Sequence, residues 1–177
     1  RVIQLVLNEC EYVIRASRTA LFVRMPNGMA CVDAGIDVFG VGEQMVCLLP
    51  LNADASARQL SETLGVPVVV SDTQSRFYRN GVVNVAIGSW GLAPIINYIG
   101  QTDDFGNQLK RTVIAVADEL ATAADLVMGK FSGVPAVVVR GYPYIQSATT
   151  SEIINNTRMY SLMELAQQEE GDVNGAD

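Results

Sequence analysis

Three aspartates stand at predicted turns or strand ends, where their carboxylates are free to bind a cation. Asp33 and Asp37 lie in a glycine-containing loop, and Asp72 follows an apolar run and precedes Thr73. Oxygen ligands suit Mg²⁺, Mn²⁺ or Ca²⁺, and a site with two or three carboxylates leaves coordination positions for phosphate oxygens. Aspartate also forms turns through its own hydrogen bonds. The pattern therefore predicts either a divalent-cation site or a set of turn-forming residues.

A second segment that could take part in a reaction is MGKFSGVP, residues 128–135, between a predicted helix and a predicted strand. Backbone N–H groups of such a turn, together with one ammonium group, can bind phosphates. It is not a P-loop, because the order Gly-x4-Gly-Lys-Ser/Thr is absent. A helix that ends at Gly129, with Lys130 near the negative end of its dipole, explains the same residues. Spacing alone leaves both interpretations open.

Two arginines, Arg76 and Arg79, flank Phe77 and Tyr78 shortly after Asp72. Guanidinium groups in this arrangement could clamp a carboxylate or a phosphate. A surface loop held by ion pairs is the alternative. The sequence favours neither.

The composition excludes several classes of function. The chain contains no histidine, which excludes Ser-His-Asp and Cys-His catalysis and histidine metal ligands. Its net charge of −7 argues against a nucleic-acid partner, although a metal-bridged anion is compatible with it. The cysteines Cys10, Cys31 and Cys47 are odd in number and lie in apolar stretches. They predict buried free thiols in a reducing compartment, the cytoplasm.

Apolar periodicity predicts the elements that position these residues. Helices are expected at 1–16, 52–64, 113–128 and 150–168, and strands at 19–25, 29–32, 45–49, 66–70, 82–88 and 135–139. Asn-Gly at 27–28 predicts a turn between the first two strands. Asn52 or Asp54 would cap the second helix, and Gly65 would end it. Asp72 would lie just past a strand, where open α/β sheets place their sites.

The length of 177 residues, 49% of them apolar, is enough for one domain. We predict a single α+β domain over residues 1–168, with a mixed, partly antiparallel sheet packed against helices, and an acidic tail at 169–177. No apolar run reaches the roughly 18 residues of a membrane span, so no membrane contact is expected. The chain starts at Arg1 within a helical pattern, which suggests an incomplete N-terminus.

Four long runs of the chain resemble one family. They read CVDAGIDVFG, LLPLNADASARQL, VVVSDTQSRFYRNGVVNVAIGSWGLAPIINYIGQTDDFGNQL and VIAVADELATAADLVMGKFSGVPAVVVRG. Their order is similar to that in the coenzyme F420-0:L-glutamate ligases, a family of γ-glutamyl ligases, and they fall within residues 1–141. The chain resembles a divergent or N-terminally truncated member of this family.

The resemblance implies the family's own α+β fold and a homodimer. It implies GTP-dependent amide formation between L-glutamate and a deazaflavin coenzyme precursor, through an acyl phosphate, with Mn²⁺ or Mg²⁺ on the triphosphate. It assigns metal ligation to Asp37, Asp72 and Thr73, and catalysis to Asp37, Asp72 and Arg76. The nucleotide-binding run falls on Met128, Gly129, Lys130, Phe131, Ser132, Gly133, Val134 and Pro135.

The chain also departs from the family pattern. Asp33 stands where asparagine is usual, and Phe39 and Gly40 stand where Ser-Asn is usual, so that one nucleotide contact is lost. These differences leave two further hypotheses. One is a ligase with a different acceptor, and the other is a relative that binds a nucleotide or a partner without turnover.

Overall fold

The computed structural model describes residues 2–76 and 79–147. Their elements are, in chain order, α1 (Val2–Glu9), β1 (Tyr12–Ala16), β2 (Leu21–Arg24), β3 (Ala30–Val32), the 3-10 helix η1 (Asp33–Gly35), α2 (Ala53–Leu64), β4 (Val68–Ser75), β5 (Val82–Trp90), β6 (Ile96–Asn97), β7 (Val113–Ile114) and α3 (Val116–Met128). The α+β class is confirmed, and each pairing between these strands is antiparallel. The predicted helix at 150–168 and the tail at 169–177 lie outside the described residues.

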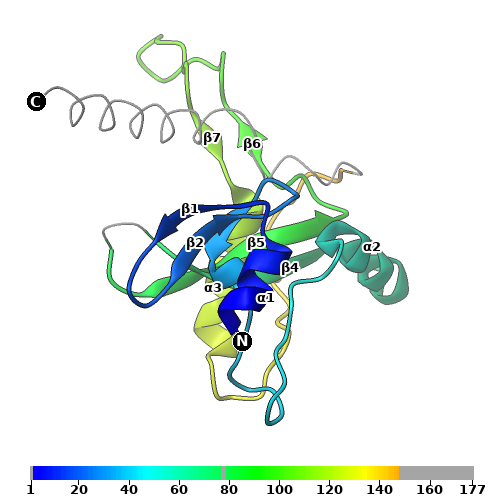
Figure 1. The fold of residues 1–177 in the computed structure, drawn as a ribbon. Coiled ribbons are helices and arrows are strands. Elements are labelled where there is room, and N and C mark those ends of the chain that lie inside the picture. Colours follow the sequence, from blue (N-terminus) through cyan, green and yellow to red (C-terminus); the bar gives the residue numbers. More distant parts are fainter. Residues whose placement is uncertain (1, 77–78, 148–177) are drawn as a thin grey trace, which may run out of the picture.

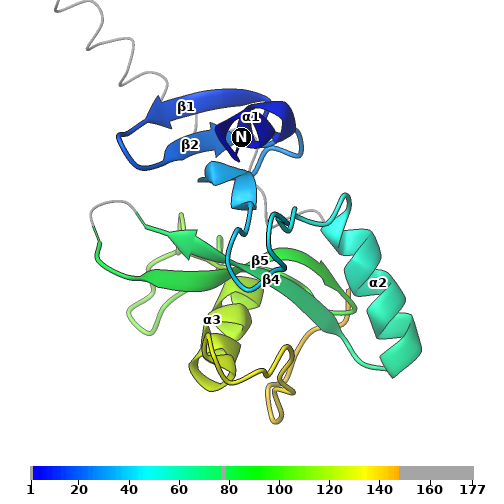
Figure 2. The ribbon, with the colours of Figure 1, turned by 60° about the horizontal axis from the view of Figure 1, so that its bottom comes forward.

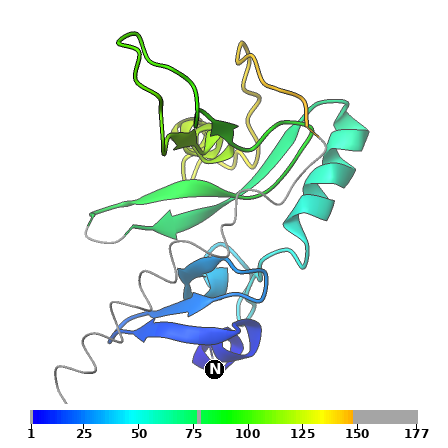
Figure 3. The same ribbon diagram turned by 90° about the horizontal axis from the view of Figure 1, so that it is seen from above.

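The elements stack in layers. Helix α1 and the sheet β1-β2-β3 lie on one side, the long β4-β5 hairpin crosses the middle, and α3 lies on the other side of the hairpin (Figure 3). Helix α2 packs against both strands of the hairpin (Figure 2). The β6-β7 arm projects away from the other elements (Figure 1). No helix in the described part of the chain is long and apolar enough to cross a membrane.

Two groups of buried side chains hold these layers together. One lies between α1 and the sheet β1-β2-β3, and it consists of Val6, Val23, Met25, Cys31 and Ala34. The other consists of small residues, which are Ala57, Ala86, Ala117 and Ala121, where α2 and α3 meet the hairpin. Small side chains let the helix backbones approach the strands closely.

Residues 2–16 contain a helix and a strand, so the predicted single helix over 1–16 is wrong. Helix α1 ends at Glu9, and Tyr12–Ala16 pairs with β2. Tyr12, Val13 and Ile14 are aromatic or β-branched residues, which suit a strand with a neighbour to pair with. A helical periodicity alone could not reveal that neighbour.

The β2-β3 hairpin and helix α2 follow their predictions closely. Gly28 adopts a left-handed φ of 90° in the predicted turn, and its N–H donates to the Met25 carbonyl at 2.8 Å. Helix α2 starts after Asn52, whose side-chain oxygen accepts from the Ala55 N–H at 2.9 Å. It ends at Gly65 in the left-handed conformation. Local side-chain and backbone bonds therefore define both structures.

Replacing Asn52 with alanine is expected to lower the free energy of unfolding by about 1 kcal/mol, because the Ala55 N–H loses its acceptor. Chemical denaturation of both proteins measures this difference. Asn52→Asp is the matched control, since aspartate also caps helices and should stay near wild type. An alanine variant as stable as wild type would show that the cap contributes nothing.

Strand β4 is longer than predicted and carries the residues expected to follow it. The Ser71-Asp72-Thr73 segment lies inside Val68–Ser75, paired with Ala86, Val85 and Asn84 of β5. Val70 pairs with Gly88 but Ser71 pairs with Ala86, so Ile87 is the extra residue of a β-bulge. The expected position at the end of a strand is therefore wrong. Asp72 lies within an antiparallel hairpin.

Two predicted strands are absent from the described residues. At 45–49 the only β-pairing is one bridge between Asp37 and Cys47, and 135–139 has no regular structure. Both segments are apolar, which predicted buried strands, but Met45 is 64% exposed and Val138 is 74% exposed. The predicted helix at 113–128 starts only at Val116, because Val113 and Ile114 pair with β6.

Candidate active site

Asp72 is a half-buried carboxylate on β4. Burial is the largest influence and raises its pKa above the ordinary 3.8. A hydrogen bond from the Thr73 backbone lowers this pKa, the charge of Asp37 raises it, and the ammonium group of Lys130 lowers it. Asp37 and Lys130 come from distant parts of the chain, and Thr73 is the next residue along β4. The fold therefore gathers three of the predicted residues around the Asp72 carboxylate.

The metal-free protein should gain stability at neutral pH when Asp72 is replaced by asparagine. The folded pKa lies above the unfolded one, so ionised Asp72 destabilises the fold above the folded pKa. This penalty disappears as the pH falls through the folded pKa toward the unfolded value. We expect a higher melting temperature for Asp72→Asn in EDTA at pH 7, and a smaller difference near pH 4. Thermal denaturation with the exposed Asp104→Asn as control measures it, and a lower melting temperature for Asp72→Asn at pH 7 would contradict it.

A sharp turn brings Asp37 to the site. Asp33, Ala34 and Gly35 all have positive φ, and the N–H of Asp37 then donates to the Cys47 carbonyl at 3.0 Å. Asp33 itself accepts from the Leu21 N–H at 2.8 Å, which ties the turn to β2. Asp33 thus has the structural role that its sequence left open.

The ammonium group of Lys130 lies against the hairpin just past the end of α3. Its Nζ donates to Thr73 Oγ1 at 2.8 Å and to Asn84 Oδ1 at 3.2 Å, and it lies 3.3 Å from Asp125 Oδ1. The Thr73 hydroxyl donates in turn to Asn84 Oδ1 at 3.0 Å. Asn84 is only 6% exposed, and its carbonyl accepts from the Thr122 hydroxyl of α3 at 2.8 Å. This polar cluster therefore links β4, β5 and α3.

Asn84 and Asp125 were not among the predicted site residues. Asparagine within the apolar run VVNVAIG was the available signal for Asn84, since a buried amide needs partners. Asp125 gave no such signal, because a single aspartate on a helix is ordinary. Only its position beside Lys130 distinguishes it.

Residues 128–135 form a helix end in this structure. Gly129 ends α3 with its N–H donating to the Asp125 carbonyl, and the Ser132 hydroxyl donates to the Met128 carbonyl. Phe131 and Val134 are exposed, and Gly133 has a positive φ. The helix-end interpretation of this segment accounts for its conformation, and its contact with a nucleotide stays a prediction.

Within the described residues, Arg76 forms no hydrogen bond or ion pair with Asp37 or Asp72. It lies four residues beyond Asp72, about 13 Å further along the strand direction. Its Nη2 donates to the Asn80 carbonyl at 3.2 Å, and its buried Nε has no hydrogen-bond partner among the described residues. Arg79 donates its backbone N–H to the Arg76 carbonyl at 3.4 Å. The role of Arg76 in catalysis stays a prediction.

The cysteines are free thiols. Burial first, and then the charges of Asp72, Asp33 and Cys10, raise the pKa of Cys31 to about 12. Cys31 therefore stays protonated at neutral pH and is a poor metal ligand. Cys10 is half-buried and Cys47 is exposed, so the prediction that all three are buried is wrong for Cys47.

Asp37 and Asp72 fit a divalent cation of the Mg²⁺ or Mn²⁺ type. Both supply carboxylate oxygens, and the charge of Asp37 raises the pKa of Asp72, so the two side chains lie within electrostatic range. No group of three or more His, Cys, Asp or Glu side chains suitable for a metal occurs within 2–76 and 79–147. Two carboxylates leave coordination positions for water or phosphate oxygens.

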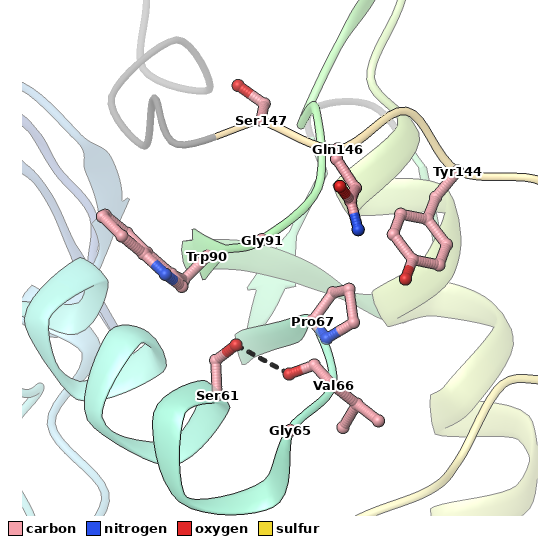
Figure 4. A pocket seen from close by; sticks show the side chains of 9 residues that line it. All are labelled: Ser61, Gly65, Val66, Pro67, Trp90, Gly91, Tyr144, Gln146 and Ser147. Atoms are coloured by element: carbon pink, nitrogen blue, oxygen red, sulfur yellow. Dashed lines mark hydrogen bonds between the residues drawn. The ribbon is translucent and has the colours of Figure 1, made fainter.

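A separate cavity of about 420 Å³ lies between the end of α2, the end of β5 and residues 144–147 (Figure 4). Its lining residues are Ser61, Gly65, Val66, Pro67, Trp90, Gly91, Tyr144, Gln146 and Ser147. None of them is charged, and none is a predicted site residue. This cavity therefore does not provide the charged groups that a triphosphate or a metal requires.

The sequence from residue 1 to residue 141 matches the family model described as F420-0:gamma-glutamyl ligase. The coenzyme F420:L-glutamate ligase of Methanothermobacter thermautotrophicus is 41% identical over 150 residues, which are 81% of this chain and 60% of the relative. The ligase of Methanopyrus kandleri is 39% identical over 148 residues, which are 80% of this chain and 59% of the relative. The ligase of Archaeoglobus fulgidus is 41% identical over 158 residues, which are 85% of this chain and 63% of the relative. The chain thus spans about three fifths of the length of these relatives.

Proposed function

Because the chain belongs to the F420-0:gamma-glutamyl ligase family, we propose that the complete protein joins L-glutamate to the deazaflavin precursor of coenzyme F420 through an amide bond. The observation that carries this proposal is the convergence of Asp37, Asp72 and Lys130 from three distant segments. Two carboxylates within electrostatic range of each other are suited to a divalent cation, which could in turn bind phosphate oxygens.

We infer that GTP is the co-substrate. The carboxylate of the acceptor attacks the γ-phosphorus, the bond to the β-phosphate oxygen breaks, and GDP leaves. The amine of glutamate then attacks the acyl phosphate, loses a proton and releases inorganic phosphate. The family resemblance supports this sequence of steps, and phosphorylation is one way to give the acceptor carboxylate the leaving group that attack by an amine requires.

The residues of this chain hold the reactants in the proposed mechanism. Asp37 and Asp72 would hold Mn²⁺ or Mg²⁺, and a bound cation lowers the repulsion between the acceptor carboxylate and the triphosphate. Residues 128–135 would offer backbone N–H groups to the nucleotide, and Arg76 would orient a carboxylate. Thr73, the third residue to which the resemblance assigns the metal, has its hydroxyl bonded to Lys130 and Asn84.

We further propose that the protein acts in the cytoplasm as a homodimer. Free thiols support a reducing compartment. Three exposed apolar side chains near the end of α3 support association, namely Leu126, Val127 and Phe131. Light scattering would give the mass of the particle, and a monomeric mass at all concentrations would contradict the dimer.

The test of the function is a reaction with Mn²⁺, GTP, L-glutamate and the deazaflavin acceptor. We expect GDP release that requires every component, and an acceptor mass that increases by one glutamyl group. No GDP release from the folded complete protein would contradict the ligase proposal. A mass increase on another acceptor alone would retain ligation and replace the substrate.

A further inference from the structure

We propose that Lys130 is a built-in cation of the active site. Its ammonium group fills the position beside Thr73, so the site binds a single divalent cation at Asp37 and Asp72, and Thr73 is not a ligand of that metal. Lys130 is then a positioning residue rather than a group that binds phosphate. The inference rests on the proposed function, because it takes the metal from there.

The ammonium group of Lys130 has as many hydrogen-bond donors as it has oxygen neighbours, which supports a fixed position for it. A lysine ammonium group has three donors and no acceptor. Three oxygens surround that of Lys130, which are Thr73 Oγ1 at 2.8 Å, Asn84 Oδ1 at 3.2 Å and Asp125 Oδ1 at 3.3 Å. These contacts use all three donors, although the side chain is 47% exposed. A phosphate could bind this group only by replacing one of them.

Strand geometry separates Thr73 from the metal-binding carboxylates. Neighbouring residues of a strand point to opposite faces, so Thr73 and Asp72 face different layers of the fold. Thr73 pairs with Asn84 across the hairpin, and both side chains accept from the ammonium group of Lys130, which follows the end of α3. Asp72 shares its face with Gln74, whose side-chain amide donates to the Ala30 carbonyl of β3 at 3.2 Å, so this face turns toward the β1-β2-β3 layer. A cation between Asp37 and Asp72 would thus lie away from the Thr73 hydroxyl.

The charges of these groups match a single divalent ion. Asp37, Asp72 and Asp125 are three carboxylates, and Lys130 supplies one positive charge. The net charge of this set is −2, which one Mg²⁺ or Mn²⁺ neutralises. Removing the lysine charge would leave Thr73, Asn84 and Asp125 oxygens facing an empty position. Those are hard oxygen ligands, which a second divalent cation prefers.

The experiment is a Mn²⁺ titration of the complete protein without nucleotide, followed by calorimetry and by electron paramagnetic resonance of free Mn²⁺. We expect one Mn²⁺ per chain in wild type, and the same affinity in Thr73→Val. Lys130→Met should bind a second Mn²⁺, and adding Thr73→Val to Lys130→Met should remove it. Lys130→Arg keeps the charge and should restore the single site.

Lys110→Met is the matched control, because Lys110 is the other lysine of the chain and is exposed on the β6-β7 arm. It should bind Mn²⁺ as wild type does. Melting temperatures of all variants verify that they are folded. They separate a change in metal number from a loss of structure.

Two results would overturn the inference. One is a loss of at least about tenfold in Mn²⁺ affinity for Thr73→Val, which would make Thr73 a ligand. The other is a folded Lys130→Met that still binds only one Mn²⁺. If the proposed metal site itself were wrong, Asp37→Asn and Asp72→Asn would leave Mn²⁺ binding unchanged, which is a result distinct from the two above. A wild-type protein and a Lys130→Met variant that both bind no Mn²⁺ would contradict both proposals.

Discussion

Asp37→Asn and Asp72→Asn are each expected to lower the rate of GTP-dependent glutamate ligation at least about a thousandfold. The two carboxylates lie close enough for the charge of Asp37 to raise the pKa of Asp72. An amide keeps the size of each side chain but removes the charge that would hold the cation. GDP release under saturating Mn²⁺, GTP and glutamate measures the effect.

Asp33→Asn is the control for this prediction, because it changes the same kind of residue in the same loop as Asp37. Its amide oxygen can still accept the Leu21 N–H, so the turn should persist and the activity should stay near wild type. If Asp72→Asn retained most of the activity while Asp33→Asn abolished it, the assignment of the metal-binding carboxylates would be wrong.

Gly88→Ala is expected to destabilise the fold by about 3 kcal/mol or more. A Cβ at this position would clash with the carbonyl carbon of Ala53 and would lie 2.7 Å from its Cβ and its carbonyl oxygen. Backbone atoms cannot rotate away, so α2 would have to move off β5. That movement would also stretch the 2.8 Å hydrogen bond from the Ser89 N–H to the Asp54 carboxylate at the start of α2.

Urea denaturation measures this loss, and Gly42→Ala is its matched control. A Cβ on Gly42 would meet only the flexible Met45 side chain, with its sulfur at 3.1 Å, and neither glycine has a positive φ. We expect a change below about 0.5 kcal/mol for Gly42→Ala, as for ordinary surface substitutions. Equal losses in the two variants would show that the contact between α2 and β5 is not responsible.

The elements that sequence predicted well are those defined by local chemistry. Asn52 and Gly65 bound α2 through side-chain and backbone bonds a few residues apart, and Asn27-Gly28 forms its hairpin turn in the same way. The errors concern partners that are distant in sequence. Tyr12–Ala16 forms a strand because it pairs with β2, whereas the equally apolar segment 135–139 has no regular structure.

In the candidate site too, residue type could be predicted from the sequence, whereas contacts between distant residues could not. Asp37 and Asp72 could be selected by residue type and by the resemblance, and the fold places them within electrostatic range of each other. The bond between Lys130 and Thr73 joins residues 57 positions apart, and no periodicity predicts which hydroxyl a lysine reaches. Asn84 gave a signal only as a polar residue in an apolar strand, and that signal does not identify its partners.

The bulge at Ile87 has a consequence for how this region can change during evolution. Strand alternation places Asp72 and Thr73 on opposite faces, and the register beyond the bulge pairs them with Val85 and Asn84 of β5. A substitution leaves this register intact, but an insertion or deletion of one residue between the bulge and Asp72 would exchange the two faces. Lineages that keep the chemistry should therefore reject changes of length in this part of the hairpin, even where they accept other residue types at positions outside the site.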